Sequence, residues 1–121
     1  MPDKMILVVE DDPTLQMVAR LAIGHLGYNC LTVGTGEEAV KYDPSKILMI
    51  FMDIGLPGIT GTDAATLIRK KDEAEKRKHV PIIGLTGHAN KEQCMSSGMD
   101  DYLQKPALLD DLKRMIDKWS I

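Results

Sequence analysis

The chain has 121 residues, which predicts a single domain over residues 1–121. Its hydrophobic content of 44% and charged content of 27% are typical of a globular protein. The net charge of −3 and the aromatic content of 4% argue against direct nucleic-acid binding, which needs a basic surface or stacking aromatic side chains.

Short apolar runs alternate with helix-like segments about five times. Residues 5–9 form a continuous apolar run, as in a parallel strand buried on both faces. A helix follows, with Asp12-Pro13 as its start signal and Gly27 as its end. Residues 28–33 predict a more polar strand, suited to a sheet edge. Thr35, with a Glu three residues later, predicts a capping box for a short second helix.

The middle of the chain holds its most apolar segment, residues 47–52, which predicts the central strand. The glycines and proline of residues 55–61 predict a loop. A third helix is expected from about Thr62 into the charged residues 69–79. These hold six Lys or Arg among three acids, which predicts a solvated helix end and loop.

Two more strands and two more helices complete the pattern. Residues 81–85 predict the fourth strand, and Asn90 with a Gln three residues later offers a cap for a helix that ends at Gly98. Residues 101–104 predict a short fifth strand. Residues 108–119 have the apolar spacing of a final amphipathic helix.

Five strands that alternate with five helices predict an α/β fold, doubly wound and flavodoxin-like, with a parallel five-stranded sheet and helices on both faces. The more polar second strand belongs at an edge, which favours the strand order 2-1-3-4-5. In that order, ligands bind beyond the carboxyl ends of the strands, near the switch point between strands one and three.

The sequence also bears on location. The longest apolar run, residues 47–52, is far shorter than a membrane span, and residues 1–4 lack the pattern of a signal peptide. Cys30 and Cys94 have no metal-binding spacing and suit a reducing compartment. We therefore expect a cytoplasmic domain without membrane contact.

Polar side chains follow four of the predicted strands at one edge of the sheet. They are Glu10, Asp11 and Asp12 after strand one, Asp53 after strand three, Thr86 after strand four and Lys105 after strand five. Asp12 is expected to cap the first helix. Carboxylates from adjacent strands repel each other unless a cation lies between them, and oxygen ligands favour Mg²⁺ or Mn²⁺ over zinc. With a hydroxyl and an ammonium group beside them, they predict a site for phosphoryl transfer.

Four segments carry a resemblance to the receiver domains of response regulators in two-component systems. They are residues 6–13, 52–57 with Gly61, 81–86 and 101–106. Residues 81–89 and 98–106 are most similar to receivers attached to hybrid sensor histidine kinases. The resemblance leaves open a free-standing receiver or one from a hybrid kinase, and it favours the second.

The resemblance implies a phosphorelay function. Asp53 would accept a phosphoryl group from a phosphohistidine of a histidine kinase or a histidine phosphotransfer protein, and the acyl phosphate would hydrolyse slowly. Asp11 would bind Mg²⁺ directly and Glu10 through water. Asp53 and the backbone carbonyl of Gly55 would supply further ligands.

The resemblance also implies a switch. Thr86 and Lys105 would bind phosphoryl oxygens, and the Lys105–Pro106 peptide bond would be cis, as is realistic only before proline. Thr86 and the aromatic Tyr102 would move on phosphorylation. That movement would alter the surface formed by helix four, strand five and helix five, the expected site for a downstream partner.

Other functions fit less well. A haloacid-dehalogenase-type phosphatase needs an Asp where this chain has Gly55, and a flavodoxin would bind phosphate where this chain has three acids. A pseudo-receiver that binds partners without phosphorylation is the alternative kept. His25, His79 and His88 are expected to have structural roles at the surface, and we hypothesise that His88, two residues after Thr86, modulates the site.

Overall fold

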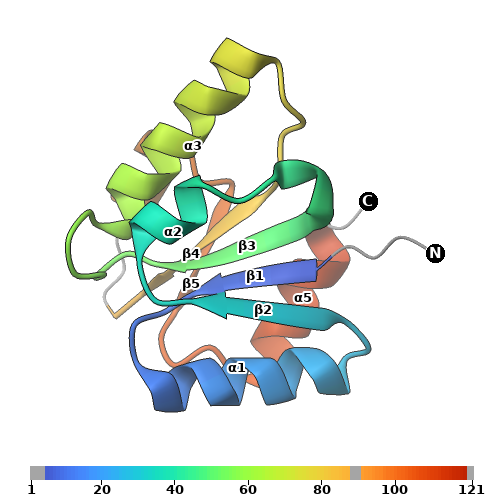
Figure 1. Ribbon diagram of the computed structural model, residues 1–121. Coiled ribbons are helices and arrows are strands. Elements are labelled where there is room, and N and C mark those ends of the chain that lie inside the picture. Colours follow the sequence, from blue (N-terminus) through green and yellow to red (C-terminus); the bar gives the residue numbers. More distant parts are fainter. Residues whose placement is uncertain (1–4, 88–90, 120–121) are drawn as a thin grey trace.

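The computed structural model describes residues 5–87 and 91–119. Its five strands form one parallel sheet in the order β2-β1-β3-β4-β5, as predicted (Figure 1). The strands are β1 (Met5–Val9), β2 (Asn29–Val33), β3 (Ile47–Asp53), β4 (Ile82–Thr86) and β5 (Asp101–Gln104). The predicted doubly wound fold is therefore confirmed.

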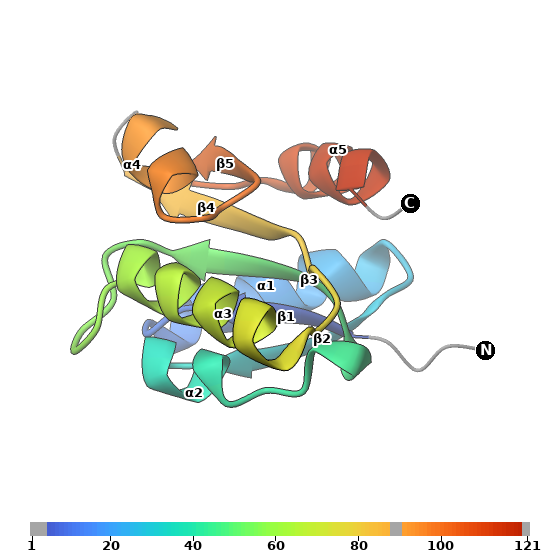
Figure 2. The same cartoon turned by 90° about the horizontal axis from the view of Figure 1, so that it is seen from above.

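Helices cover both faces of this sheet (Figure 2). They are α1 (Pro13–His25), α2 (Gly36–Val40), α3 (Gly61–Glu75), α4 (Lys91–Ser96) and α5 (Leu109–Trp119), with a 3₁₀ turn, η1 (Pro44–Lys46), before β3. Helices α1 and α5 share one buried cluster, and α2, α3 and α4 share the other. In the described residues, no helix combines the length and apolar character that crossing a membrane requires.

The two clusters explain the continuous apolar runs in the sequence. Successive strand residues point to opposite faces of the sheet, so that Leu7 packs under α2 and α3 while Val8 packs under α1 and α5. Central β3 shows the same alternation, with Phe51 on one face and Met52 on the other, both fully buried. Burial on both faces requires apolar residues at every position.

The helix ends follow the predicted signals in part. The Asp12 carboxylate accepts hydrogen bonds from the first turn of α1, and Gly27 has a φ of +93° after that helix. The hydroxyl of Thr35 caps α2 by accepting a hydrogen bond from the amide of Glu38. The Glu38 carboxylate, however, accepts from the Thr35 hydroxyl and not from the Thr35 amide, so only one of the two hydrogen bonds of the predicted capping box forms. A complete box, not predicted, starts α3 at Thr60. The cap expected at Asn90 lies outside the described residues.

The expectation of a solvated segment over residues 69–79 is wrong for three side chains. Arg69 and Arg77 both pair with Asp72, at 3.2 and 2.9 Å, and each of the three side chains is at most 17% exposed. Arg69 also reaches Asp100 in the turn before β5, at 2.7 Å. The Arg69–Asp100 ion pair ties α3 to the turn that follows α4.

One glycine sets the position of the loop after β3. The amide of Gly61 donates to the carbonyl oxygen of Ile54 at 3.1 Å. A Cβ atom on Gly61 would lie 2.7 Å from the Cα atom of Ile54 and would overlap the carbonyl oxygen of Asp53. The start of α3 therefore packs directly on the backbone that carries Asp53.

Replacement of Gly61 tests this close approach. We expect Gly61→Ala to lower the free energy of unfolding by about 1–3 kcal/mol, because the added methyl group displaces backbone atoms. Gly24→Ala is the matched control in α1, where nothing lies within 4 Å of the added atom. In this control, the higher helix propensity of Ala should raise the free energy of unfolding by about 0.5–1 kcal/mol. Urea unfolding measures both, and a Gly61→Ala variant as stable as the wild type would contradict the close approach.

Candidate functional site

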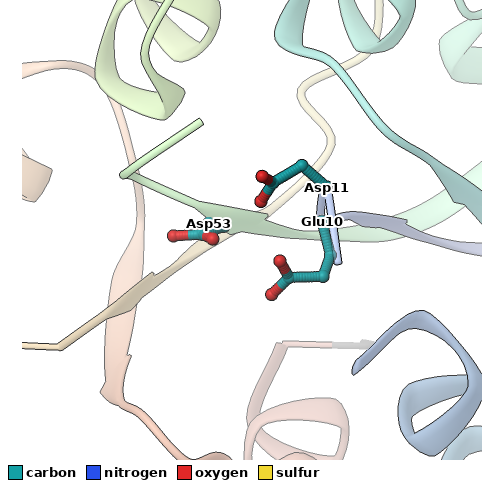
Figure 3. Close-up of side chains that lie close together, drawn as sticks. All are labelled: Glu10, Asp11 and Asp53. Atoms are coloured by element: carbon teal, nitrogen blue, oxygen red, sulfur yellow. The ribbon is translucent and has the colours of Figure 1, made fainter. Parts of the chain in front are cut away.

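Three carboxylates meet at the carboxyl edge of the sheet. Strands β1 and β3 are parallel neighbours in which Val9 lies opposite Met52, so the residues that follow them emerge side by side. One carboxylate oxygen from each of Glu10, Asp11 and Asp53 lies within 4.8 Å of the other two (Figure 3). The predicted acidic cluster therefore forms in the structure.

The members of this cluster differ in exposure. Glu10 and Asp53 are only 3% and 6% exposed, whereas Asp11 is open to solvent. Burial disfavours the ionised form, and together with the nearby charge of Asp53 it raises the pKa of Glu10 above its ordinary value of 4.5. The backbone amide of Asp12 and the charge of Lys105 oppose this rise without cancelling it.

Lys105 supplies a positive charge to the cluster. Its Nζ atom lies 3.0 Å from Oδ2 of Asp53 and 3.3 Å from Oε1 of Glu10. Burial lowers the pKa of Lys105, but the hydrogen bond and negative charge of Asp53, with the charge of Glu10, raise it above its usual value. Lys105 is therefore held protonated beside both buried carboxylates.

The backbone brings Lys105 to this point through Thr86. The amide of Lys105 donates to the carbonyl oxygen of Thr86 at 2.7 Å, where β4 and β5 end together. The Lys105–Pro106 peptide bond is cis, as expected. Ile54, directly after Asp53, donates its amide to the carbonyl oxygen of Leu85, so Thr86 lies between the strand ends that carry Asp53 and Lys105.

The expected switch residues occupy different environments. Thr86 is almost fully buried, with 1% exposed. Tyr102 on β5 lies opposite Gly84, which is two positions before Thr86 on β4. Its side chain is half-buried against the apolar cluster that α2, α3 and α4 share. It therefore lies on the neighbouring strand and not in the carboxylate cluster. His88 lies outside the described residues.

The loop after β3 adds a contact that the sequence did not reveal. The amide of Gly55 donates to Oδ1 of Asp53 at 2.9 Å, while Lys105 holds Oδ2. A backbone amide is carried by almost every residue type, so no sequence pattern marks it. Its effect is to fix the orientation of the Asp53 carboxylate.

The donor set fits a hard divalent cation. It consists of carboxylate oxygens with more negative charge than Lys105 balances, and one member is open to solvent. Mg²⁺ prefers such oxygen ligands and usually retains several waters, for which the exposed side of Asp11 leaves room. The cluster that the structure brings together contains neither of the residue types, His and Cys, that favour zinc.

Comparison with known proteins identifies the family. Residues 6–117 match the model of the response regulator receiver domain. The chain belongs to this family. A curated relative, hybrid signal transduction histidine kinase F of Dictyostelium discoideum, is 34% identical over 119 residues, which cover 94% of this chain. The chain spans only 11% of the length of that kinase.

Solved receiver structures are similar over nearly the whole chain. In the complex of the Saccharomyces cerevisiae phosphotransfer protein Ypd1 with the Ssk1 receiver domain, the matched chain has a TM-score of 0.88 and 30% identity, covering 98% of this chain and 90% of that one. The receiver domain of the histidine kinase PA1611 from Pseudomonas aeruginosa has a TM-score of 0.81 and 35% identity, covering 96% of each chain. That receiver has a magnesium ion coordinated in its active-site cleft.

The raised pKa of Glu10 predicts that ionisation of this side chain lowers the free energy of unfolding. Because the folded state favours the protonated form of this carboxyl group, its contribution to the free energy of unfolding is fully present below its ordinary pKa of 4.5. That contribution is lost as the pH rises through the raised pKa of the folded state. In metal-free buffer, Glu10→Gln should therefore be more stable than the wild type at neutral pH, and this advantage should disappear in acid. Glu92→Gln makes the same change at an exposed acid on α4 and is the control. Urea unfolding between about pH 4 and pH 8 measures the difference, and a constant offset for Glu10→Gln would contradict the prediction.

Proposed function

We propose that this receiver domain accepts a phosphoryl group on Asp53 from a phosphohistidine of a histidine kinase or a histidine phosphotransfer protein. The observation that carries the proposal is the position of the Asp53 carboxylate, within the acidic cluster and 3.0 Å from the ammonium group of Lys105. The transfer forms a P–O bond to Asp53 and breaks the P–N bond. The imidazole nitrogen keeps the electron pair of the broken bond.

The side chains around Asp53 suit this reaction. The amide of Gly55 orients the carboxylate. A phosphoryl group adds nearly two negative charges, which Lys105 would meet by moving its ion pair from Asp53 to a phosphoryl oxygen. The hydroxyl of Thr86 would bind a second phosphoryl oxygen. These contacts would hold the group in place after transfer.

We propose that Glu10, Asp11 and Asp53, with the backbone carbonyl of Gly55, hold Mg²⁺. When bound, the cation neutralises negative charge on the cluster and on the incoming phosphoryl oxygens. The same oxygen ligands would accept Mn²⁺. Asp11, the exposed member of the cluster, would bind the cation directly, and Glu10 would bind it through water, as the family resemblance implies.

The consequence of phosphorylation would be a shift at Thr86 and Tyr102. Movement of the buried Thr86 toward the phosphoryl group would leave space at the end of β4, into which half-buried Tyr102 could turn. This would change the surface of α4, β5 and α5, where we place a downstream protein partner. A pseudo-receiver that is never phosphorylated has no support from the acidic cluster or from the comparisons.

The relatives suggest the wider context. We propose that residues 1–121 form one receiver domain that works on the cytoplasmic side of a signalling system, within or beside a hybrid histidine kinase. Its similarity to receivers of such kinases and to a receiver bound to Ypd1 supports this placement.

An apolar surface beside Asp53 suits docking of the phosphodonor protein. Leu15, Val18 and Leu21 of α1 are 39–69% exposed, and Leu108 before α5 is 63% exposed. A cavity of about 110 Å³ between α1 and α5 is lined mainly by apolar side chains and also by Glu10 and Lys105. Because this surface continues into the site, a donor that presents its phosphohistidine to Asp53 would cover it. We call it the α1 surface.

Intact mass spectrometry tests the phosphoacceptor. After incubation with acetyl phosphate and Mg²⁺, we expect one phosphoryl adduct on the wild type and none on Asp53→Asn or with EDTA. Asp117→Asn, at an acid on α5 remote from the cluster, should be labelled like the wild type. An adduct that persists in Asp53→Asn would assign the phosphoryl group to another residue and overturn the proposal.

A charge on the α1 surface tests docking. We expect Val18→Asp to slow phosphoryl transfer at least tenfold from a histidine phosphotransfer protein that labels the wild type, because a buried unpaired carboxylate is costly. Labelling by acetyl phosphate should be unchanged, since a small donor needs no docking surface. Met95→Asp, at a 44% exposed position on α4, is the control. If the phosphotransfer protein labels Val18→Asp as fast as Met95→Asp, the donor docks elsewhere.

A further inference from the structure

The loop between β1 and α1 carries two of the three clustered acids, and its backbone is held at both ends. The amide of Glu10 donates to the carbonyl oxygen of Val33 at 3.0 Å, at the end of β2. The carbonyl oxygen of Glu10 accepts a hydrogen bond from the side-chain amide of Gln16, with 2.6 Å between Nε2 and the oxygen. Both main-chain groups of Glu10 therefore have a partner.

The next part of this loop is also fixed. The amide of Asp12 donates to Oε2 of Glu10 at 3.2 Å, and the carboxylate of Asp12 caps α1. The carbonyl oxygen of Asp12 accepts from the backbone amide of Gln16 at 2.9 Å. Gln16 thus bonds the residues before and after Asp11, one with its side chain and one with its backbone.

We propose that Gln16 is a positioning residue for the divalent cation, an inference that rests on the proposed function. The Glu10 carbonyl belongs to the peptide group that joins Glu10 to Asp11. By holding this oxygen, Gln16 fixes the plane of that peptide and with it the direction in which the Asp11 side chain leaves the backbone. Gln16 acts through the peptide, because its own bond goes to the backbone and not to a carboxylate.

The residue type fits this role. The contact needs an N–H donor, which Glu cannot supply in its ionised form and Met cannot supply at all. Lys could donate, but its charge would oppose a cation bound to the neighbouring acids. Gln offers a neutral donor on a half-buried side chain. Partners that orient metal ligands in this indirect way are typically worth about 10–100-fold in metal affinity.

A Mg²⁺ titration followed by backbone amide NMR signals tests the proposal. We expect the dissociation constant for Mg²⁺ to rise about tenfold in Gln16→Met, which fills similar space but cannot donate. Gln93→Met makes the same chemical change at an exposed position on α4 and should stay within about twofold of the wild type. At saturating Mg²⁺, labelling of Gln16→Met by acetyl phosphate should return to within about twofold of the wild-type rate, because Asp53 and Lys105 are intact.

A second variant guards against misfolding. Gln16→Asn keeps the amide but is one methylene shorter, so its nitrogen falls short of the Glu10 oxygen and the same loss of affinity is expected. A folded Gln16 variant with wild-type Mg²⁺ affinity would overturn the positioning role alone. A wild type that binds no Mg²⁺ would overturn the proposed metal site, and the inference with it.

Discussion

Repulsion among Glu10, Asp11 and Asp53 is the constraint to which the rest of the site responds. Parallel strands β1 and β3 end side by side, so the topology that buries the core also forces these acids together. Two of them are almost fully buried, where the interaction between charges is stronger than in water. Lys105 offsets part of the repulsion, and the excess of negative charge that remains is what a divalent cation would relieve.

The backbone around the cluster is correspondingly tightly fixed. Gly61 allows α3 to start against the backbone of Asp53, and the amide of Gly55 orients the Asp53 carboxylate. On the other strand, Val33 and Gln16 hold the two main-chain groups of Glu10. Carboxylates that repel one another would otherwise turn apart. These hydrogen bonds to the backbone of Glu10 and to the Asp53 carboxylate therefore help to keep the acids together.

The sequence was sufficient to predict the sheet and the acidic cluster because both follow from local patterns. Apolar runs identify strands buried on both faces, and residues after parallel strands must meet at one edge. The ion pairs of Arg69 could not be predicted, since Asp100 is 31 positions away and only folding brings it near. Gln16 gave no signal because a polar residue in the first turns of a helix is ordinarily solvated. The contact of Gly55 involves only its backbone amide, which no residue type marks.

Lys105 connects the two surfaces that the proposed function uses. Its ammonium group pairs with Asp53, while its side chain also lines the cavity of the α1 surface. Lys105 directly follows β5, so the proposed change in its pairing would act on the strand that carries Tyr102. The turn before β5 is held to α3 by Arg69, through Asp100 and the carbonyl oxygen of Gly98. The proposed re-pairing of Lys105 with a phosphoryl oxygen would therefore meet a fixed point at the start of β5, which favours rearrangement at the carboxyl end of the strand.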